Sequence, residues 1–118
     1  MVLKGQVVDG LGNACFWVNK IEEVFLNKYG IKLFSGTLNV KLEDKYNLAN
    51  YWIIKPKEYG GTQKVYVQEC ELLGNKSYIV RAEKTAHESD IIEIISDVNF
   101  REKYKLKNGD TVELILLF

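Results

Sequence analysis

Two neutral side-chain oxygens stand close together in the first half of the chain. Thr37 and Asn39 follow Gly36, in a stretch where apolar and polar residues alternate. Residues two apart on a β-strand point to the same face, so the hydroxyl and the amide oxygen would lie side by side. Magnesium accepts such oxygen ligands when substrate phosphates supply the negative charge. The pair therefore suits a magnesium site, and a polar pair facing solvent would show the same spacing.

A turn with two glycines separates a predicted strand from a predicted helix. It reads Gly10-Leu11-Gly12. Without a Cβ in the way, backbone N–H groups at such a turn can converge on an anion. A plain turn would also explain these residues.

A polar loop leads into a run of isoleucines near the end of the chain. Thr85–Ser89 is rich in hydrogen-bonding groups, and Glu93 then interrupts four isoleucines in 91–95. By strand alternation, Ile91, Glu93 and Ile95 share one face. On a solvent-facing surface two isoleucines would be exposed beside the carboxylate, so the wall of a pocket explains the mixture better than an outward-pointing glutamate.

Familiar catalytic signatures are missing from the sequence. It contains no GxxxxGK[ST], HExxH or GxSxG motif, and His87 is the single histidine. Cys15 and Cys70 are too few for a disulfide framework and lack metal-binding spacing. An enzyme with this sequence would work through backbone and oxygen contacts.

The elements that position these residues can be predicted from periodicity. A helix ending at Gly30 is indicated by apolar residues at three- and four-residue spacings, and Asn19 with Glu22 has the spacing of a capping box. Asn99 and Glu102 repeat that spacing before a short Phe100–Lys105 helix. The helical face consists of Trp17, Ile21, Val24, Phe25 and Lys28.

The rest of the chain alternates with a period of two, which is typical of strands. Six or so short strands in a chain this small suggest a closed or nearly closed barrel, which leaves no exposed edges. The predicted strands are Lys4–Val8, Leu38–Leu42, Tyr51–Ile54, Val65–Leu72, Tyr78–Ala82, Ile91–Ile95 and Thr111–Leu117.

Size and charge narrow the class of protein further. The 118 residues make one domain, and 16 basic residues balance 16 acidic ones. Zero net charge argues against nucleic-acid binding, which needs a basic face. Nothing at the start resembles a signal peptide, and no apolar run approaches the ~20 residues that span a bilayer. We expect a cytoplasmic monomer that binds small molecules, not nucleic acid or membrane.

Four motifs follow one another along the chain. They read Val7-Val8-Asp9-Gly10-Leu11-Gly12, Gly36-Thr37-Leu38-Asn39-Val40-Lys41-Leu42, Thr85 through Ile95, and Leu106-Lys107-Asn108-Gly109-Asp110. In this order they resemble the motifs of the archaeal-type CTP-dependent riboflavin kinases, and the resemblance runs essentially end to end. It implies a mainly β fold: a small six-stranded cradle-loop (RIFT-related) β-barrel with two or three short helices, in a single domain over 1–118.

The resemblance also implies an activity, which is phosphoryl transfer from CTP to the ribityl 5′-hydroxyl of riboflavin to give FMN and CDP. Thr37 and Asn39 would then hold Mg²⁺, and Thr85 and Glu93 would contact the flavin. Such a reaction demands positioning and charge neutralisation more than a nucleophilic side chain. A loop would wrap the nucleotide, and a second segment would also contact it. The implied loop residues are Gly10, Leu11, Gly12, Asn13, Ala14, Cys15 and Phe16, and the implied segment is Val98, Asn99, Phe100 and Arg101.

The chain departs from the family pattern after the glycine turn. Where the family usually has an acidic residue, a third glycine and often a basic residue, this chain has Asn13-Ala14-Cys15. One alternative is therefore a flavin- or nucleotide-binding module of the same fold without catalysis. Another is a small DNA-binding β-barrel regulator, because such proteins carry a similar L-x-x-GD turn, although zero net charge argues against it.

Overall fold

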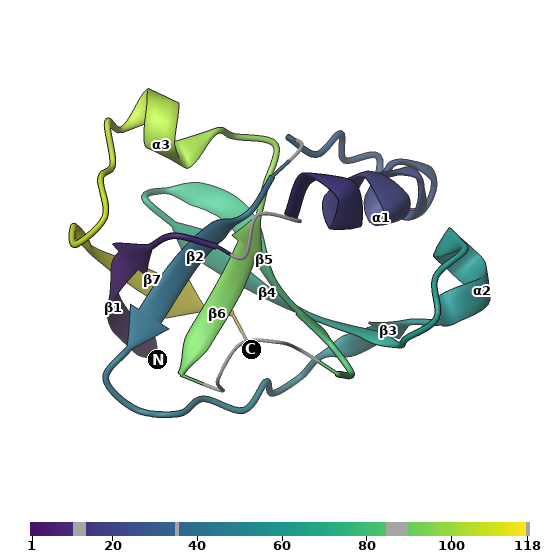
Figure 1. Cartoon of the computed structure of the whole chain (residues 1–118), viewed down its shortest axis with the longest axis horizontal. Helices are drawn as coiled ribbons and strands as arrows, with labels where there is room; N and C mark the ends of the chain where they lie inside the picture. Colours follow the sequence, from purple (N-terminus) through teal and green to yellow (C-terminus); the bar gives the residue numbers. More distant parts are fainter. Residues whose placement is uncertain (11–13, 35, 85–89, 118) are drawn as a thin grey trace.

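One curved sheet dominates the computed structural model, which describes residues 1–10, 14–34, 36–84 and 90–117. Figure 1 shows the strands curling round on one another, with the helices on the outside. The strands are β1 (Val2–Val8), β2 (Leu38–Leu42), β3 (Trp52–Ile54), β4 (Val65–Leu72), β5 (Asn75–Ala82), β6 (Ile91–Ile95) and β7 (Thr111–Leu116). The helices are α1 (Ala14–Tyr29), α2 (Pro56–Tyr59) and α3 (Phe100–Lys103).

Six of the strands close into a barrel. The hydrogen-bonded order is β3-β4-β5-β6-β2-β1-β7, and a further pairing between β4 and β7 completes the ring. The pairings are antiparallel, and β3 lies outside the ring, against β4. The predicted fold, a mainly β six-stranded barrel with two or three short helices, is confirmed, with three helices formed.

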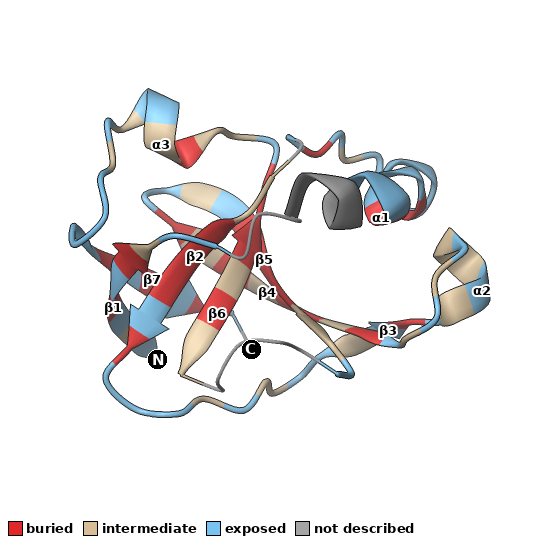
Figure 2. Ribbon diagram, in the orientation of Figure 1, coloured by how far each residue is buried: buried red, intermediate tan, exposed pale blue. Residues whose placement is uncertain are grey.

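Two apolar clusters hold the fold together. One fills the barrel and includes Val40 and Ile92, while the other lies between α1 and the outer face of the sheet and includes Phe25, Val80 and Ile95. Figure 2 shows how the buried residues are concentrated in the strands. Strand β6 contributes to both clusters, which explains why isoleucines occupy both of its faces.

Helix α1 begins earlier than the sequence suggests. Its first residue is Ala14, so Asn19 lies inside the helix and the predicted capping box at Asn19 and Glu22 is wrong. A glutamate three residues after an asparagine occurs both at helix N-termini and on the exposed side of a helix. The sequence alone therefore could not distinguish an N-cap at Asn19 from a position inside the helix. The C-terminal prediction is confirmed, because Gly30 has φ +67° and its N–H donates to the Leu26 carbonyl at 3.0 Å.

Local turns set the bounds of the other elements. The second predicted cap is confirmed, because Oδ1 of Asn99 accepts from the Glu102 N–H at 3.2 Å. Helix α3 nevertheless ends at Lys103, since the chain turns left-handed at Lys105 (φ +55°). Strand β5 begins three residues before the predicted start, because Leu73 and Gly74, at φ +51° and +78°, form a two-residue hairpin loop with β4. No helix in the described part of the chain is long and apolar enough to cross a membrane.

Candidate functional site

Thr37 and Asn39 lie together, as their spacing predicts. Nδ2 of Asn39 donates to Oγ1 of Thr37 at 3.3 Å. The Asn39 side chain belongs to the strand face that points away from the barrel interior, yet only 4% of the residue is exposed. It is covered because the chain leaving β1 passes over it, so closely that a Cβ added at Gly10 would lie 2.5 Å from Nδ2.

The other amide atom of Asn39 lacks a partner. Oδ1 is buried and accepts no hydrogen bond from any described residue. A buried polar atom left unpaired costs folding free energy, so native structures keep few of them, and such an atom calls for an explanation. An oxygen that ligates a cation when substrate is bound provides one.

The residues present fit a magnesium ion that is shared with substrate phosphates. Oγ1 of Thr37 and Oδ1 of Asn39 are neutral oxygens on neighbouring side chains, the kind of ligand that a hard cation prefers. The described residues contain no group of three or more His, Cys, Asp or Glu side chains that could hold a metal by themselves. Most of the negative charge around the ion would therefore come from the substrate.

Glu93 lies directly beside Asn39 in the sheet. The two residues are register partners across β2 and β6, and Glu93 is also the partner of Val80 on β5. Side chains paired in this way have Cβ atoms about 4.5–5.5 Å apart. Since register partners share a face of the sheet, the half-buried Glu93 lies on the same outer face as Asn39.

The surroundings of Glu93 differ partly from the expected pocket wall. Ile95, predicted to share that wall, instead packs into the cluster beneath α1, and Ile91 is half-buried. The positively charged group that interacts with the Glu93 carboxylate is the guanidinium of Arg81. Burial lowers the pKa of the Arg81 guanidinium, and Tyr46 and the carboxylate of Glu93 act in the opposite direction.

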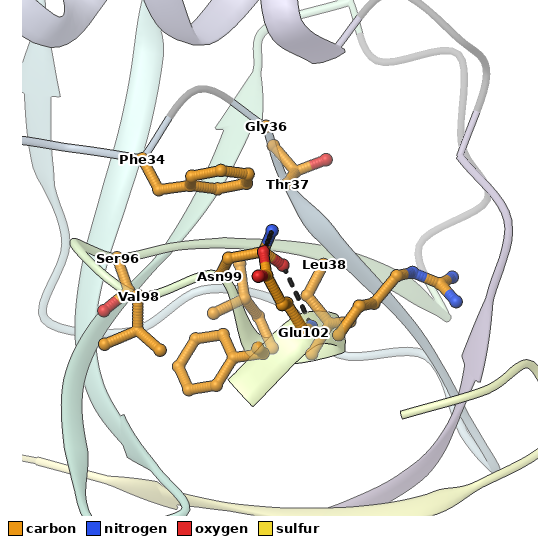
Figure 3. A pocket seen from close by; sticks show the side chains of 11 residues that line it. Phe34, Gly36, Thr37, Leu38, Ser96, Val98, Asn99 and Glu102 are labelled. Carbon is orange, nitrogen blue, oxygen red and sulfur yellow. Dashed lines mark hydrogen bonds between the residues drawn. The ribbon is translucent and has the colours of Figure 1, made fainter. Parts of the chain in front are cut away.

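A cavity of about 450 Å³ brings together Thr37 and the whole predicted 98–101 segment. Figure 3 shows the ring of Phe34 across this cavity from Val98 and Asn99, with Thr37 beside it. Thr37, one of the two candidate metal ligands, thus meets the candidate nucleotide segment in this cavity. The lining residues are Phe34, Gly36, Thr37, Leu38, Ile94, Ser96, Val98, Asn99, Phe100, Arg101 and Glu102.

Arg101 connects this cavity to the end of β1. Its Nη2 donates to the Val8 carbonyl at 3.1 Å and to Oδ1 of Asn108 at 2.8 Å, and lies 3.9 Å from Oδ1 of Asp9. Val8 and Asp9 immediately precede Gly10, so the guanidinium fixes the direction in which the chain leaves the barrel. It also places a positive charge beside Asp9, which precedes Gly10 in the sequence.

The fourth motif has a structural task at the same place. The N–H of Gly109 donates to the Val7 carbonyl, and the Val7 N–H donates to the Asp110 carbonyl, both at 2.8 Å. Oδ2 of Asp110 accepts from the Lys107 N–H at 2.8 Å and closes the turn. The motif therefore docks its turn on β1 and needs no DNA-binding role to explain it.

The remaining predicted site residues are placed only in part. Leu11, Gly12, Asn13 and Thr85 lie outside the described residues. Ala14, Cys15 and Phe16, predicted as part of a loop, form the first turn of α1, so that part of the prediction is wrong about conformation. The three- and four-residue spacing of apolar residues that indicates a helix covers too few residues here to distinguish a loop from the first turn of a helix.

Six lining residues were not predicted as site residues, and two of them, Phe34 and Glu102, are exposed. Phe34 precedes the second motif, and Glu102 was recognised only as a capping residue. An exposed aromatic next to a functional motif is a usable signal for the first. For Glu102, the capping-box spacing already explained the residue, so nothing in the sequence indicated that its side chain also lines a cavity.

Comparisons with known proteins show which family this chain is similar to. The model of the CTP-dependent riboflavin kinase domain, described as "Domain of unknown function DUF120", matches residues 7–116. A riboflavin kinase of Staphylothermus marinus is 36% identical over 97% of this chain and 90% of its own length. A riboflavin kinase of Methanococcus maripaludis is 34% identical over 98% of this chain and 100% of its own length.

Other relatives are longer than this chain. A riboflavin kinase of Thermococcus kodakarensis is 39% identical over 96% of this chain, and the match covers 57% of the relative. The chain thus spans less than two thirds of some of the curated relatives it matches and nearly the whole of others.

Proposed function

Since the chain belongs to the family of CTP-dependent riboflavin kinase domains, we propose that it phosphorylates riboflavin, with CTP as donor and Mg²⁺ as cofactor. Riboflavin and CTP would give FMN, CDP and a proton. The bond between the ribityl 5′-oxygen and the γ-phosphorus forms as the bond from that phosphorus to the β-phosphate oxygen breaks.

The buried, unpartnered Oδ1 of Asn39 is the observation that carries this proposal. It lies beside Thr37 Oγ1 and opposite Glu93, and Thr37 itself lines the cavity formed by the 98–101 segment. Donor and acceptor sites would then adjoin at the candidate metal ligands. Phosphoryl transfer needs this kind of positioning together with charge neutralisation.

Each group in the site has a task in this proposal. Thr37 and Asn39 would hold Mg²⁺, which neutralises phosphate charge when it is bound. Arg101 would keep the chain before Gly10 in place and add positive charge beside the phosphates. Glu93 would accept a hydrogen bond from polar atoms of the flavin and hold the acceptor next to the donor.

One assay tests the proposal. Purified protein is incubated with riboflavin, Mg²⁺ and CTP, UTP, ATP or GTP separately, and FMN is measured by chromatography. We expect FMN formation that is fastest with CTP and is abolished by a metal chelator. Equal rates with CTP and ATP would contradict CTP as the preferred donor. Flavin binding without FMN formation with any donor would instead favour the non-catalytic binding module.

A further inference from the structure

The cavity beside Thr37 contains an aromatic ring that the fold does not bury. Phe34 is 41% exposed although it is large and apolar. Its backbone is fixed, because its N–H donates to the Ser96 carbonyl at 2.9 Å. Its ring rests against Gly36, where an added Cβ would lie 3.2 Å from Cε1. A held, exposed ring of this kind is a stacking surface for a flat ligand group.

A carboxylate lines the same cavity across from this ring. Oε2 of Glu102 accepts from Nδ2 of Asn99 at 3.3 Å, and Oδ1 of Asn99 accepts from the Glu102 N–H at 3.2 Å. The mutual bonds hold the two side chains as a pair, and Glu102 is exposed to the cavity. Figure 3 shows this pair facing Phe34.

The charges along the cavity would orient a nucleotide bound within it. A carboxylate repels phosphates, so a triphosphate would lie away from Glu102, toward Thr37 and the guanidinium of Arg101. The base would then lie between Phe34 and the Asn99–Glu102 pair. This orientation follows from the fixed charges and from the position of the ring.

We propose that Phe34 and Glu102 bind the base of the nucleotide, Phe34 by stacking on any base and Glu102 by accepting a hydrogen bond from the cytosine N4 amine, so that Glu102 selects cytosine. This inference rests on the proposed function. A carboxylate accepts well from the N4 amine of cytosine, whereas uracil presents a carbonyl oxygen at the same place and would be repelled. The Asn99 amide can donate to the ring nitrogen or to O2 of the base. Glu102 is therefore the residue that distinguishes cytosine from uracil.

The decisive variant is Glu102→Gln. Glutamine keeps the length and the capping ability of glutamate, so α3 should form. Its amide can turn either an oxygen or an NH₂ group toward the base, and it can therefore accept uracil as well as cytosine. The dissociation constants of CDP and UDP are measured by calorimetry, and kcat/KM for CTP and UTP by FMN formation. We expect the preference for cytosine to fall at least tenfold in both measurements.

Matched variants separate base reading from general effects. Glu113→Gln changes an exposed glutamate on β7 and should leave the cytosine preference as in the parent protein. Phe34→Leu should weaken CDP and UDP binding alike, by about tenfold, since stacking on an aromatic ring tolerates any base. Phe34→Tyr should restore binding, because it retains an aromatic face.

Each outcome decides one point. An unchanged cytosine preference in Glu102→Gln overturns the inference, even if the parent protein makes FMN. A parent protein that prefers CDP to UDP and loses this preference in Glu102→Gln, yet makes no FMN, supports the inference and contradicts the kinase activity. A parent protein that binds neither CDP nor UDP contradicts both.

Discussion

At the scale of single residues, the proposed metal site depends most on the side-chain amide of Asn39. Asn39→Ala removes the unpartnered Oδ1 and one 3.3 Å hydrogen bond to Thr37. We expect FMN formation at saturating Mg²⁺ to fall at least tenfold, about 1.4 kcal/mol of activation free energy, while the melting temperature changes little. Asn47→Ala, at an exposed position, serves as the control. Full activity in Asn39→Ala would remove the metal-binding role.

Glu93 tests the acceptor side of the site. Glu93→Gln keeps the shape of the side chain and removes its charge, next to Asn39 in the sheet. Riboflavin affinity should fall by about 1–3 kcal/mol, the range for a hydrogen bond to a charged group, and stability should change little because the residue is half-buried. Calorimetric titration with riboflavin measures this. If the variant binds riboflavin as tightly as the parent protein, Glu93 does not contact the flavin.

Among the elements, the segment leaving β1 controls the site through close contact. A Cβ at Gly10 would lie 2.5 Å from Nδ2 of Asn39, whereas a Cβ at Gly30 would meet nothing within 4 Å. Gly10→Ala should therefore displace the amide and lower FMN formation at least as far as Asn39→Ala does. Gly30→Ala strains a residue at φ +67°, so it should lower stability by about 1 kcal/mol and leave the activity of the folded protein unchanged.

These two glycine variants are compared by denaturant unfolding and by turnover per folded molecule. Opposite patterns are expected, with activity lost at Gly10 and stability lost at Gly30. Equal turnover in both variants would show that the contact with Asn39 has no bearing on activity.

Local patterns predict strand bounds better than they predict helix bounds. The bounds of β4 and β6 agree with the sequence, because β-branched and apolar residues fill both strands and turns flank them. The start of α1 does not, since nothing local distinguishes its first turn from a loop. The pairing of Thr37 with Asn39 was predictable from a spacing of two. The pairing of Asn39 with Glu93 was not, because it depends on the long-range register between β2 and β6.

At the scale of the whole molecule, one seam closes the barrel. Residues 70–72 of β4 pair with residues 114–116 of β7, which joins the end of the chain to its middle. Cys70 lies in this seam with 0% exposure, and burial raises the pKa of its thiol to about 12, with the Glu69 carboxylate adding to the rise. The thiol is therefore neutral and inaccessible while the seam is closed.

Cys70 can consequently report how the barrel opens. In a Cys15→Ser background, a thiol reagent at pH 8 should label Cys70 only through unfolding, so the free energy of opening and its denaturant dependence should equal those of global unfolding. The raised pKa also predicts that stability contributed by the neutral thiol is present below the ordinary pKa of 9.0 and is lost as the pH rises toward 12. Cys70→Ala should lose this pH dependence. Labelling that is faster than unfolding and insensitive to denaturant would show instead that the β4–β7 seam opens by itself, as a local fluctuation of an otherwise intact barrel.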